Sequence, residues 1–383
     1  MKIVMDFRKF YGVIGGVEQL VIQLTKHITS RGHQVVLLCR RKYHRQLTEM
    51  LSNEANLKLI PLPVDTELIG LKNVWIDSIT IQNIAEEEGA NVIHFPYNWS
   101  FPLRKKVPCI LTIHDLIPYT IRESMGFFTN RLLYKPGTRL ACRLNDVIAT
   151  VSEFSKREIM EKFTIPPGNI RVIPNGFRQP AIPDSTLERG LEIKYGLGDR
   201  FIICVGGIHE RKNIVRLIHA FSKLVSQHGY TGKLVVTGST SGHPYIDRMK
   251  RLCDKAIAET GTEGRVKLTG FIPDEELDTL LRHADFLIYP SYYEGFGIPI
   301  IEAMQVGTPV ITSNMGGTAE VAGDAAALIN PYDTDDMTSM MHRLLSERDL
   351  RAELTRRGEK RASTYSWVST GDRYLQLYQD TAM

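Results

Sequence analysis

The chain shows two hydrophobic patterns: short continuous apolar runs, and longer stretches in which apolar positions recur with a helical period. The first run, "KIVMDF" at residues 2–7, predicts a strand, and "GVIGG" at residues 12–16 predicts a turn after it. A helix is predicted over residues 17–32, because its apolar positions share one face: Val17, Leu20, Val21, Leu24 and Ile28. Gly32 ends this helix, and "HQVVLLC" predicts the next strand.

The same order of elements returns in the second half of the chain. "FIICVGG" at residues 201–207 predicts a strand and a glycine turn, "NIVRLIHAFSKLVSQHG" a helix, and "KLVVTG" a strand. Alternating elements with continuous apolar strands are typical of parallel sheets covered on both faces. We therefore predict an α/β fold of two Rossmann-like doubly wound domains that face each other across a cleft, joined by the Pro-rich stretch at residues 172–190.

Composition agrees with a soluble globular protein of this size. The chain has 383 residues, of which 43% are hydrophobic and 23% charged, enough for two domain cores. No apolar run is long enough to span a bilayer, and "MKIVMDF" lacks the features of a signal peptide. The five cysteines are scattered, which favours reduced thiols in a cytoplasmic protein over disulfides or a zinc site.

Charge is spread unevenly along the chain. The net charge is +4, but residues 1–180 carry 24 Lys and Arg against 16 Asp and Glu. A basic first half suggests an anionic partner, such as a membrane surface or a phosphate-bearing substrate. A solvated surface of mixed charge explains the same counts equally well.

Two loops of the first half follow predicted strands. Gly15 and Gly16 lie between the first strand and the first helix. They either let backbone N–H groups bind an anion or only form a tight turn. Their spacing is not the GxGxxG dinucleotide fingerprint. His114 ends the apolar run in "LTIHDLIP", which places it at the predicted cleft, as either a structural or a catalytic histidine.

Arg211 and Lys212 lie in "GGIHERKN", between a glycine turn and the start of a helix. A helix N-terminus attracts negative charge, and Arg grips two oxygens while Lys acts as a point charge. We therefore favour a diphosphate ligand for this pair over two solvent-facing cations.

Two glutamates, Glu294 and Glu302, lie eight positions apart in "SYYEGFGIPIIEA". The pattern predicts a strand over 286–289, a loop holding Glu294, and a helix from about Ile298 to Gln305 that holds Glu302. Carboxylates accept hydrogen bonds from pairs of hydroxyls, so these two suit a sugar and a ribose. The loop amides of Gly295, Phe296, Gly297 and Ile298 add possible donors to a ligand.

Together these loops predict a nucleotide diphosphate sugar as the ligand. We expect no metal and no cofactor, because no Asp-x-Asp follows a strand and no His/Cys cluster occurs. The cations and the helix N-terminus are expected to neutralise the leaving diphosphate instead.

"EGFGIPIIE" resembles the E-x7-E motif of the family 4 glycosyltransferases, retaining enzymes of the two-domain GT-B fold. The resemblance covers nearly the whole chain, with these stretches in the expected order: "GGVEQL", "TIHDLIP", "VSEFSKREI", "VIPNGF", "GGIHERKN", "LTGFIPDEEL" and "YPSYYEGFGIPIIEAMQVGTPVITSN". It implies an N-terminal acceptor-binding domain (1–178), a C-terminal donor-binding domain (179–363), and a final helix (364–383) that crosses back to the first domain.

The resemblance also implies roles for residues. Gly16 resembles the backbone contact to the donor phosphate, His114 a histidine near the transferred sugar, and Arg211 with Lys212 the diphosphate clamp. Glu294 resembles the carboxylate on the sugar hydroxyls and Glu302 the ribose-binding glutamate. His114, Arg211, Lys212 and Glu294 are thus the predicted catalytic residues. The predicted donor-binding residues are Gly15, Gly16, Arg211, Lys212, Gly295, Phe296, Gly297, Ile298 and Glu302.

Three stretches look most like bacterial mannosyltransferases of surface-polysaccharide synthesis that use GDP-mannose: "HFPYNWSFPL", "TIHDLIPYTIRES" and the region around residues 320–329. The expected acceptor is a lipid-linked glycan. The basic clusters at residues 40–45 and 104–106 suit peripheral contact with the cytoplasmic face of an anionic membrane. The alternatives are a UDP-sugar-dependent glucosyltransferase with a soluble acceptor, and a silent nucleotide- or glycan-binding scaffold. A nucleic acid partner is not expected.

Overall fold

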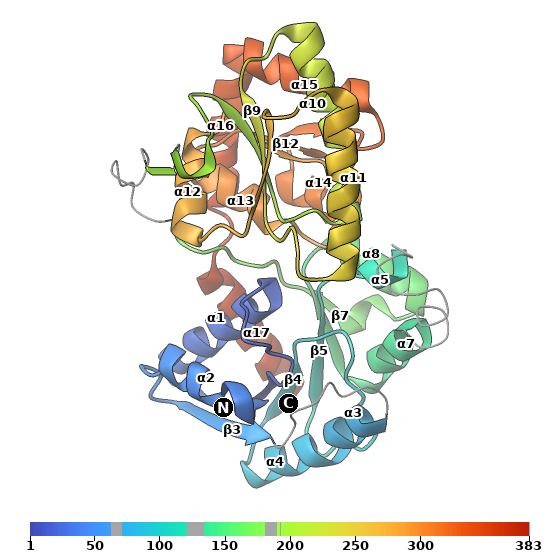
Figure 1. Cartoon of the computed structure of the whole chain (residues 1–383). Coiled ribbons are helices and arrows are strands. Elements are labelled where there is room, and N and C mark those ends of the chain that lie inside the picture. Colours follow the sequence, from blue (N-terminus) through green and yellow to red (C-terminus); the bar gives the residue numbers. More distant parts are fainter. Residues whose placement is uncertain (63–70, 121–133, 181–189, 192, 383) are drawn as a thin grey trace. The chain divides into compact units, whose positions relative to one another are not determined.

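The computed structural model describes residues 1–62, 71–120, 134–180, 190, 191 and 193–382, and Figure 1 shows its elements. The chain divides into two compact units. Unit 1 comprises Met1–Gly176 and Ser366–Met383, and unit 2 comprises Phe177–Tyr365. The boundaries predicted from sequence were residues 178 and 363. Part of the predicted linker, residues 181–189, lies outside the described residues.

Unit 1 is built on a seven-stranded parallel sheet in the order β3-β2-β1-β4-β5-β6-β7, counted over the described residues. Its strands are β1 (Lys2–Asp6), β2 (Gln34–Arg40), β3 (Leu57–Leu62), β4 (Val92–Phe95), β5 (Cys109–Ile113), β6 (Val147–Thr150) and β7 (Ile170–Val172). The central strands are buried on both faces, as a sheet covered by helices requires.

Helices cover the two faces of this sheet. They are α1 (Gly16–Ser30), α2 (His44–Met50), α3 (Leu71–Trp75), α4 (Ile81–Glu87), α5 (Ile117–Thr120), α7 (Lys135–Leu144), α8 (Glu153–Phe163) and α17 (Trp367–Ala382). Successive strand residues point to opposite faces, so Ile3 joins a core with α1 and α17, while Val4 joins a core with α4, α7 and α8. Figure 1 shows α1 and α17 on one side and α7 on the other.

The last helix, α17, packs against α1. A glycine, Gly371, permits this close approach, because a Cβ there would overlap the ring of His27. Farther along α17, the Tyr374 hydroxyl lies 3.1 Å from Thr112 Oγ1, and the Tyr378 hydroxyl lies 2.8 Å from His94 Nδ1. Polar contacts inside the core thus fix the position of α17 on the sheet of unit 1.

Unit 2 repeats the design with a six-stranded parallel sheet in the order β10-β9-β8-β11-β12-β13, again over the described residues. Its strands are β8 (Phe201–Val205), β9 (Lys233–Thr237), β10 (Val266–Gly270), β11 (Leu287–Tyr289), β12 (Val310–Ser313) and β13 (Ala327–Ile329). The prediction of two doubly wound α/β domains is therefore confirmed.

The helices of unit 2 flank its sheet, with α10 and α11 on one side and α12 and α13 on the other (Figure 1). They are α10 (Ile214–His228), α11 (Pro244–Thr260), α12 (Asp274–His283), α13 (Ile298–Gln305), α14 (Gly316–Ala322), α15 (Thr334–Ser346) and α16 (Arg348–Ala362). One core joins apolar residues of α10, α11 and α15 to the strands. In both units the strand order reverses beside the first strand, where sheets of this kind bind ligands at the carboxyl ends of their strands.

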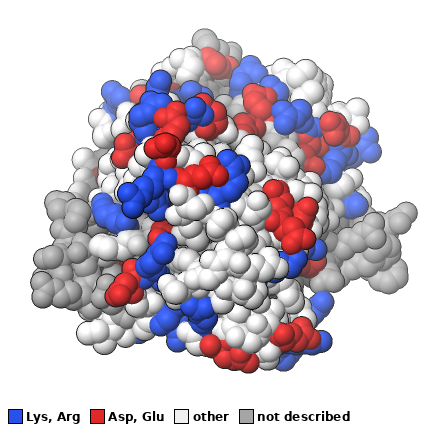
Figure 2. All heavy atoms as spheres, turned by 90° about the horizontal axis from the view of Figure 1, so that it is seen from above, with Lys and Arg blue, Asp and Glu red and all other residues white. Residues whose placement is uncertain are grey.

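The surface carries both signs of charge. Figure 2 shows Lys and Arg next to Asp and Glu over the face that it displays, with uncharged residues between them. Exposed ion pairs of unit 2 include Lys223–Asp335 and Arg343–Glu347. Over the described part of the chain, no helix combines the length and the hydropathy that crossing a bilayer requires.

Candidate functional site

The loop after β8 brings two cations to the end of the sheet of unit 2. Gly206 and Gly207 both have positive φ, +115° and +78°, which a residue with a side chain rarely adopts. The chain then forms a short 3₁₀ turn over Glu210–Lys212 before α10 begins. Gly206 also leaves room for Lys212, because a Cβ at Gly206 would lie 2.8 Å from the lysine Nζ. The glycine turn thus fixes where the lysine side chain lies.

The loop after β11 brings Glu294 to the same place. Gly297, with φ +122°, ends the loop at the N-terminus of α13. Gly317, on α14, donates its N–H to the Glu294 carbonyl oxygen at 2.9 Å, and a Cβ on Gly317 would overlap the Gly295 carbonyl. The Tyr292 N–H donates to the Arg211 carbonyl oxygen at 3.1 Å, which ties the two loops together.

Glu294 Oε1 is the centre of a group that we call the Glu294 cluster: Arg211, Lys212, Tyr289 and Glu294. Arg211 Nη1 pairs with this oxygen, and Lys212 Nζ lies 2.7 Å from it. The Tyr289 hydroxyl donates to the same oxygen at 3.1 Å and accepts a hydrogen bond from Lys212. Three donors therefore converge on one carboxylate oxygen at the carboxyl end of β11.

Burial and charge set the ionisation of this cluster. Burial alone would raise the pKa of Glu294, but Lys212 and Arg211 outweigh it, so the pKa of Glu294 lies below its usual value. Burial lowers the pKa of Lys212, and Glu294 opposes that change. Burial also raises the pKa of Tyr289 well above its usual value, so its hydroxyl keeps the proton that it donates. Nearby His209 has a pKa lowered to about 4 by burial and the two cations, which makes it neutral at pH 7.

Glu302, on α13, belongs to a second group, the Glu302 cluster: Arg178, Asp274, Asp278 and Glu302. Arg178 Nε lies 3.3 Å from Glu302 Oε1 and 3.5 Å from Asp274 Oδ2, and Arg178 Nη1 pairs with Asp278. One arginine thus pairs with three carboxylates. Burial raises the pKa of Glu302 to about 7, Arg178 opposes this, and the two aspartates reinforce it.

The other predicted residues of unit 2 lie between the two clusters along the chain. Phe296 is buried, with its ring 5.6 Å from that of Tyr365 in an edge-on arrangement. Gly297 caps α13 and Ile298 is its first residue. The first-turn N–H groups of α13 therefore follow directly after the Glu294 loop, an arrangement that attracts anions.

The predicted residues of unit 1 lie after its strands β1 and β5. Gly15 and Gly16 are exposed at the N-terminus of α1, where the Gly15 N–H donates to Glu18 Oε2 at 3.0 Å. His114 follows β5, half-buried, with Nε2 3.1 Å from the Pro96 carbonyl oxygen. Burial lowers the pKa of His114 to about 4, against the effect of that carbonyl, so the ring is neutral at pH 7.

Sequence reasoning missed Tyr289 and Arg178. Tyr289 ends the apolar run of β11 and looked like one more buried strand residue, although its place at the carboxyl end of a strand was a usable signal. Arg178 lay in the stretch interpreted as a linker. No local pattern indicates its partners, since Asp278 is 100 residues away in the sequence.

Within the described residues, no group of three or more His, Cys, Asp or Glu side chains is arranged to hold a metal ion. What the Glu294 cluster offers a ligand is two cations, a neutral hydroxyl and adjacent helix N–H groups. This set suits a polyanion such as a diphosphate.

Two family descriptions match the two halves of the chain. Residues 14–178 match "Glycosyltransferase Family 4", and residues 193–361 match "Glycosyl transferases group 1". Among curated proteins, the O-antigen chain mannosyltransferase B of Escherichia coli is 33% identical over 291 residues, which cover 75% of this chain and 74% of that protein.

A second relative is longer than this chain. The serotype-specific mannosyltransferase WbdA of Escherichia coli is 28% identical over 286 residues, which are 72% of this chain but 34% of WbdA, so the chain spans about a third of that relative. Among solved structures, Anabaena HepE in complex with UDP-glucose has a TM-score of 0.77 at 18% identity, covering 99% of this chain and 100% of HepE. This likeness shows that the two chains share a fold.

Proposed function

The chain belongs to family 4 of the glycosyltransferases, and from that premise we propose that it is a retaining, metal-independent enzyme that transfers mannose from GDP-mannose to a lipid-linked glycan. More coarsely, the chain is a hexosyltransferase of polysaccharide synthesis with the two-domain GT-B fold, a nucleotide-sugar donor and a glycan acceptor.

The observation that carries the proposal is the Glu294 cluster. Arg211 and Lys212 are the cations for the donor diphosphate, and Glu294 accepts hydrogen bonds from hydroxyls of the transferred sugar. Without a ligand, the two cations pair with the single carboxylate of Glu294 and leave a net positive charge. A diphosphate that enters the cluster replaces Glu294 as the main partner of the cations, which leaves carboxylate lone pairs for the sugar.

This exchange has a physical rationale. Lys212 is only 5% exposed, so its charge acts through little water and interacts strongly with any nearby anion. The two cations stabilise the negative charge that develops on the leaving diphosphate, which is the task that a metal ion performs in other transferases. In the proposed reaction the acceptor hydroxyl attacks the anomeric carbon from the face that the diphosphate leaves, and the leaving phosphate takes the hydroxyl proton. No protein nucleophile is needed.

Glu302 is assigned to the donor ribose. Replacing Glu302 with Ala is expected to raise the donor KM by roughly tenfold with a smaller change in kcat, because one charge-assisted contact is worth about 1.5 kcal/mol or more. Kinetics with GDP-mannose measure this change. An equal loss of affinity for inorganic pyrophosphate, which has no ribose, would contradict the assignment. The roles of Gly15, Gly16 and His114 stay predictions.

Mannose is proposed because an O-antigen mannosyltransferase is 33% identical to this chain over three quarters of its length. The same relative favours an acceptor in O-antigen synthesis, a bacterial surface polysaccharide. The proposal also includes a lipid-linked acceptor and peripheral contact of unit 1 with the cytoplasmic face of an anionic membrane, which attracts Lys and Arg side chains.

The test is a transfer assay with purified full-length chain. GDP-mannose, UDP-glucose and other nucleotide sugars are offered with a panel of glycan acceptors, with and without EDTA, and the anomeric configuration of the product is read by NMR. We expect transfer from GDP-mannose, retention of configuration and no loss of rate in EDTA.

Three results would contradict parts of the proposal separately. Transfer from UDP-glucose alone overturns the donor, and inversion overturns the stereochemistry. If the chain shows no turnover, and calorimetry detects no binding of GDP or UDP, the proposed donor site is wrong. Binding without turnover across the whole panel favours the scaffold alternative.

A further inference from the structure

Helix α7 of unit 1 carries a row of cations that the proposed function does not use. Lys135, Arg139 and Arg143 are spaced four residues apart, so they share one face of the helix. Like charges at this spacing disfavour a helix. In the described parts of the chain, no carboxylate forms an ion pair with any of the three. Within the described residues, the row is thus positive charge without an acidic partner.

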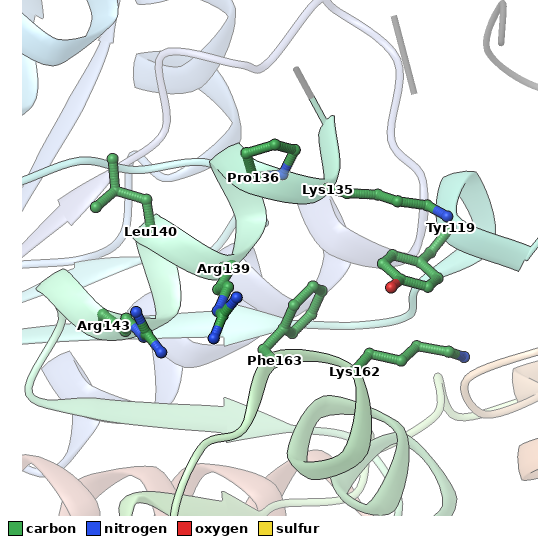
Figure 3. Close-up of a pocket in the computed structure, with 8 residues that line it drawn as sticks. All are labelled: Tyr119, Lys135, Pro136, Arg139, Leu140, Arg143, Lys162 and Phe163. Atoms are coloured by element: carbon green, nitrogen blue, oxygen red, sulfur yellow. The ribbon is translucent and has the colours of Figure 1, made fainter. Parts of the chain in front are cut away.

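These cations line a pocket of about 350 Å³, the α7 pocket (Figure 3). Its lining residues are Tyr119 of α5, Lys135, Pro136, Arg139, Leu140 and Arg143 of α7, and Lys162 and Phe163 of α8. No acidic residue is among them. Figure 3 shows Arg139 and Arg143 reaching toward the same space, with Phe163 beside Arg139 and Lys135 extending to Tyr119.

Aromatic packing holds the other end of the pocket in place. Lys135 Nζ lies 4.1 Å from the centre of the Tyr119 ring, and Lys162 Nζ lies 5.2 Å from it. The rings of Tyr119 and Phe163 are 5.7 Å apart, edge to face. Lys162 also pairs with Glu158 on its own helix, so its charge is partly neutralised. Three helices therefore preorganise the pocket around the cations.

The charge and size of the pocket identify the class of ligand. Arginine binds phosphate and carboxylate through two parallel hydrogen bonds, and lysine is a compact point charge beside it. A single carboxylate would leave most of this charge uncompensated, whereas a phosphate monoester carries nearly two negative charges near neutral pH. A volume of about 350 Å³ is at the small end of ligand pockets. We propose that the α7 pocket binds a phosphate ester.

This site is separate from the proposed donor site. All of its residues belong to unit 1, whereas Arg211 and Lys212 belong to unit 2. It also differs from the basic clusters that the sequence suggested. Arg40 is buried and donates to the Arg8 carbonyl oxygen, and Lys105 and Lys106 pair with Asp146 and Glu86. The phosphate ester has two possible sources, a soluble phosphorylated compound and a phospholipid headgroup.

Lysine footprinting on the full chain tests the proposal with glycerol 3-phosphate as the probe. Acylation of Lys135 is followed by mass spectrometry, with Lys42, which is exposed outside the pocket, as the internal reference. A ligand at ten times its Kd is expected to slow labelling of Lys135 about tenfold and to leave Lys42 unchanged. The readout is local, so phosphate bound elsewhere does not interfere.

A double variant, Arg139→Gln with Arg143→Gln, tests whether the cations bind the probe. Both side chains are exposed, so the fold is expected to survive. The probe concentration for half-protection should rise roughly tenfold for each arginine removed. The matched control is Arg157→Gln with Arg373→Gln, the same change of charge at two exposed positions of unit 1 outside both the pocket and the basic clusters.

Sedimentation with phosphatidylcholine vesicles, with and without phosphatidic acid, whose headgroup is a phosphate monoester, separates the two sources. Protection by glycerol 3-phosphate that is lost only in the pocket variant supports a soluble ester. Binding to the anionic vesicles that is lost only in the pocket variant supports a headgroup. The proposal is overturned if the pocket and control variants behave alike in both assays. Transfer from GDP-mannose is scored separately, so failure here says nothing against the donor site.

Discussion

Glu294 and Glu302 come from one short stretch of the chain, but their surroundings differ in the ratio of cations to acids. In the Glu294 cluster, two cations and a hydroxyl serve one carboxylate, and the pKa of Glu294 falls below its usual value. In the Glu302 cluster, one arginine serves three carboxylates, and the pKa of Glu302 rises to about 7.

The difference shows that a motif of two identical residues does not define two identical groups. Both side chains are largely buried, so burial acts on them in the same direction. What separates them is the number of compensating charges, which come from other parts of unit 2. Glu294 is therefore an ionised partner of cations throughout the neutral range, while Glu302 changes its charge near physiological pH.

The largest expected effect comes from removing the Glu294 charge. Glu294→Gln takes away the carboxylate that pairs with buried Lys212 and half-buried Arg211, so the free energy of unfolding should fall by about 3 kcal/mol. Urea titrations at pH 8 measure this loss in the free energy of unfolding. Glu302→Gln is the matched control, and we expect little or no loss there, because Arg178 keeps two aspartates. Equal losses in the two variants would abolish the contrast between the clusters.

Removing Lys212 should affect turnover more than folding. Lys212→Met keeps the apolar part of the side chain but removes the positive charge that is proposed to bind the diphosphate. The kcat/KM for the nucleotide sugar should therefore fall about 100-fold. Initial rates over a range of donor concentrations give the value. Lys223→Met, at an exposed lysine paired with Asp335, is the control and should act like the wild type. An unchanged kcat/KM in Lys212→Met would place the diphosphate elsewhere.

A pH effect is expected from Glu302. Its pKa is raised from 4.5 to about 7 in the folded chain, so the folded state binds this proton more tightly than the unfolded state between those values. The contribution of Glu302 to stability is therefore full below about pH 4.5 and is lost as the pH rises through 7. Each pKa unit corresponds to about 1.4 kcal/mol, so the loss is roughly 3 kcal/mol.

Urea titrations of the wild type and of Glu302→Gln at several pH values isolate this term. The difference in the free energy of unfolding between the two proteins should change between about pH 4.5 and 7 and stay constant at other pH values. A difference that does not depend on pH would mean that Glu302 titrates normally, and the second cluster would then resemble the first.

The smallest effect belongs to the hydroxyl of Tyr289. Tyr289→Phe keeps the ring against Lys212 but removes one donor to Glu294 and one acceptor from Lys212. A loss of about 1 kcal/mol corresponds to roughly a fivefold decrease in kcat/KM. The pH dependence assigned to Glu302 should not change. If it does, the two clusters are coupled and not independent.

The fold was predictable because its signals are local. Apolar runs marked the strands, and the helix predicted from about Ile298 to Gln305 occurs with those bounds, since Pro299 suits a first helical turn and Gly297 precedes it. The predictions of the GT-B fold, of a family 4 glycosyltransferase and of a hexosyltransferase are confirmed. The donor, the stereochemistry and the absence of a metal requirement stay predictions.

The electrostatics of the site were not predictable in the same way. From the sequence, Arg211, Lys212 and Glu294 were expected in loops that follow strands. The structure shows that these strands, β8 and β11, are neighbours in the sheet, so their loops meet at one edge. The sequence showed no sign that these groups pair with one another before a ligand binds. Nor did it indicate Arg178, because the partners of a buried charge depend on which distant segments the fold brings together.

The position of α17 has a consequence for how the protein is made. Unit 2 is inserted between two parts of unit 1, and the polypeptide returns to unit 1 only at Ser366. On the ribosome unit 2 is therefore complete before the sheet of unit 1 is covered by α17. Until the final residues emerge, His94 and Thr112 lack their tyrosine partners, and the apolar face beneath α17 is open to water.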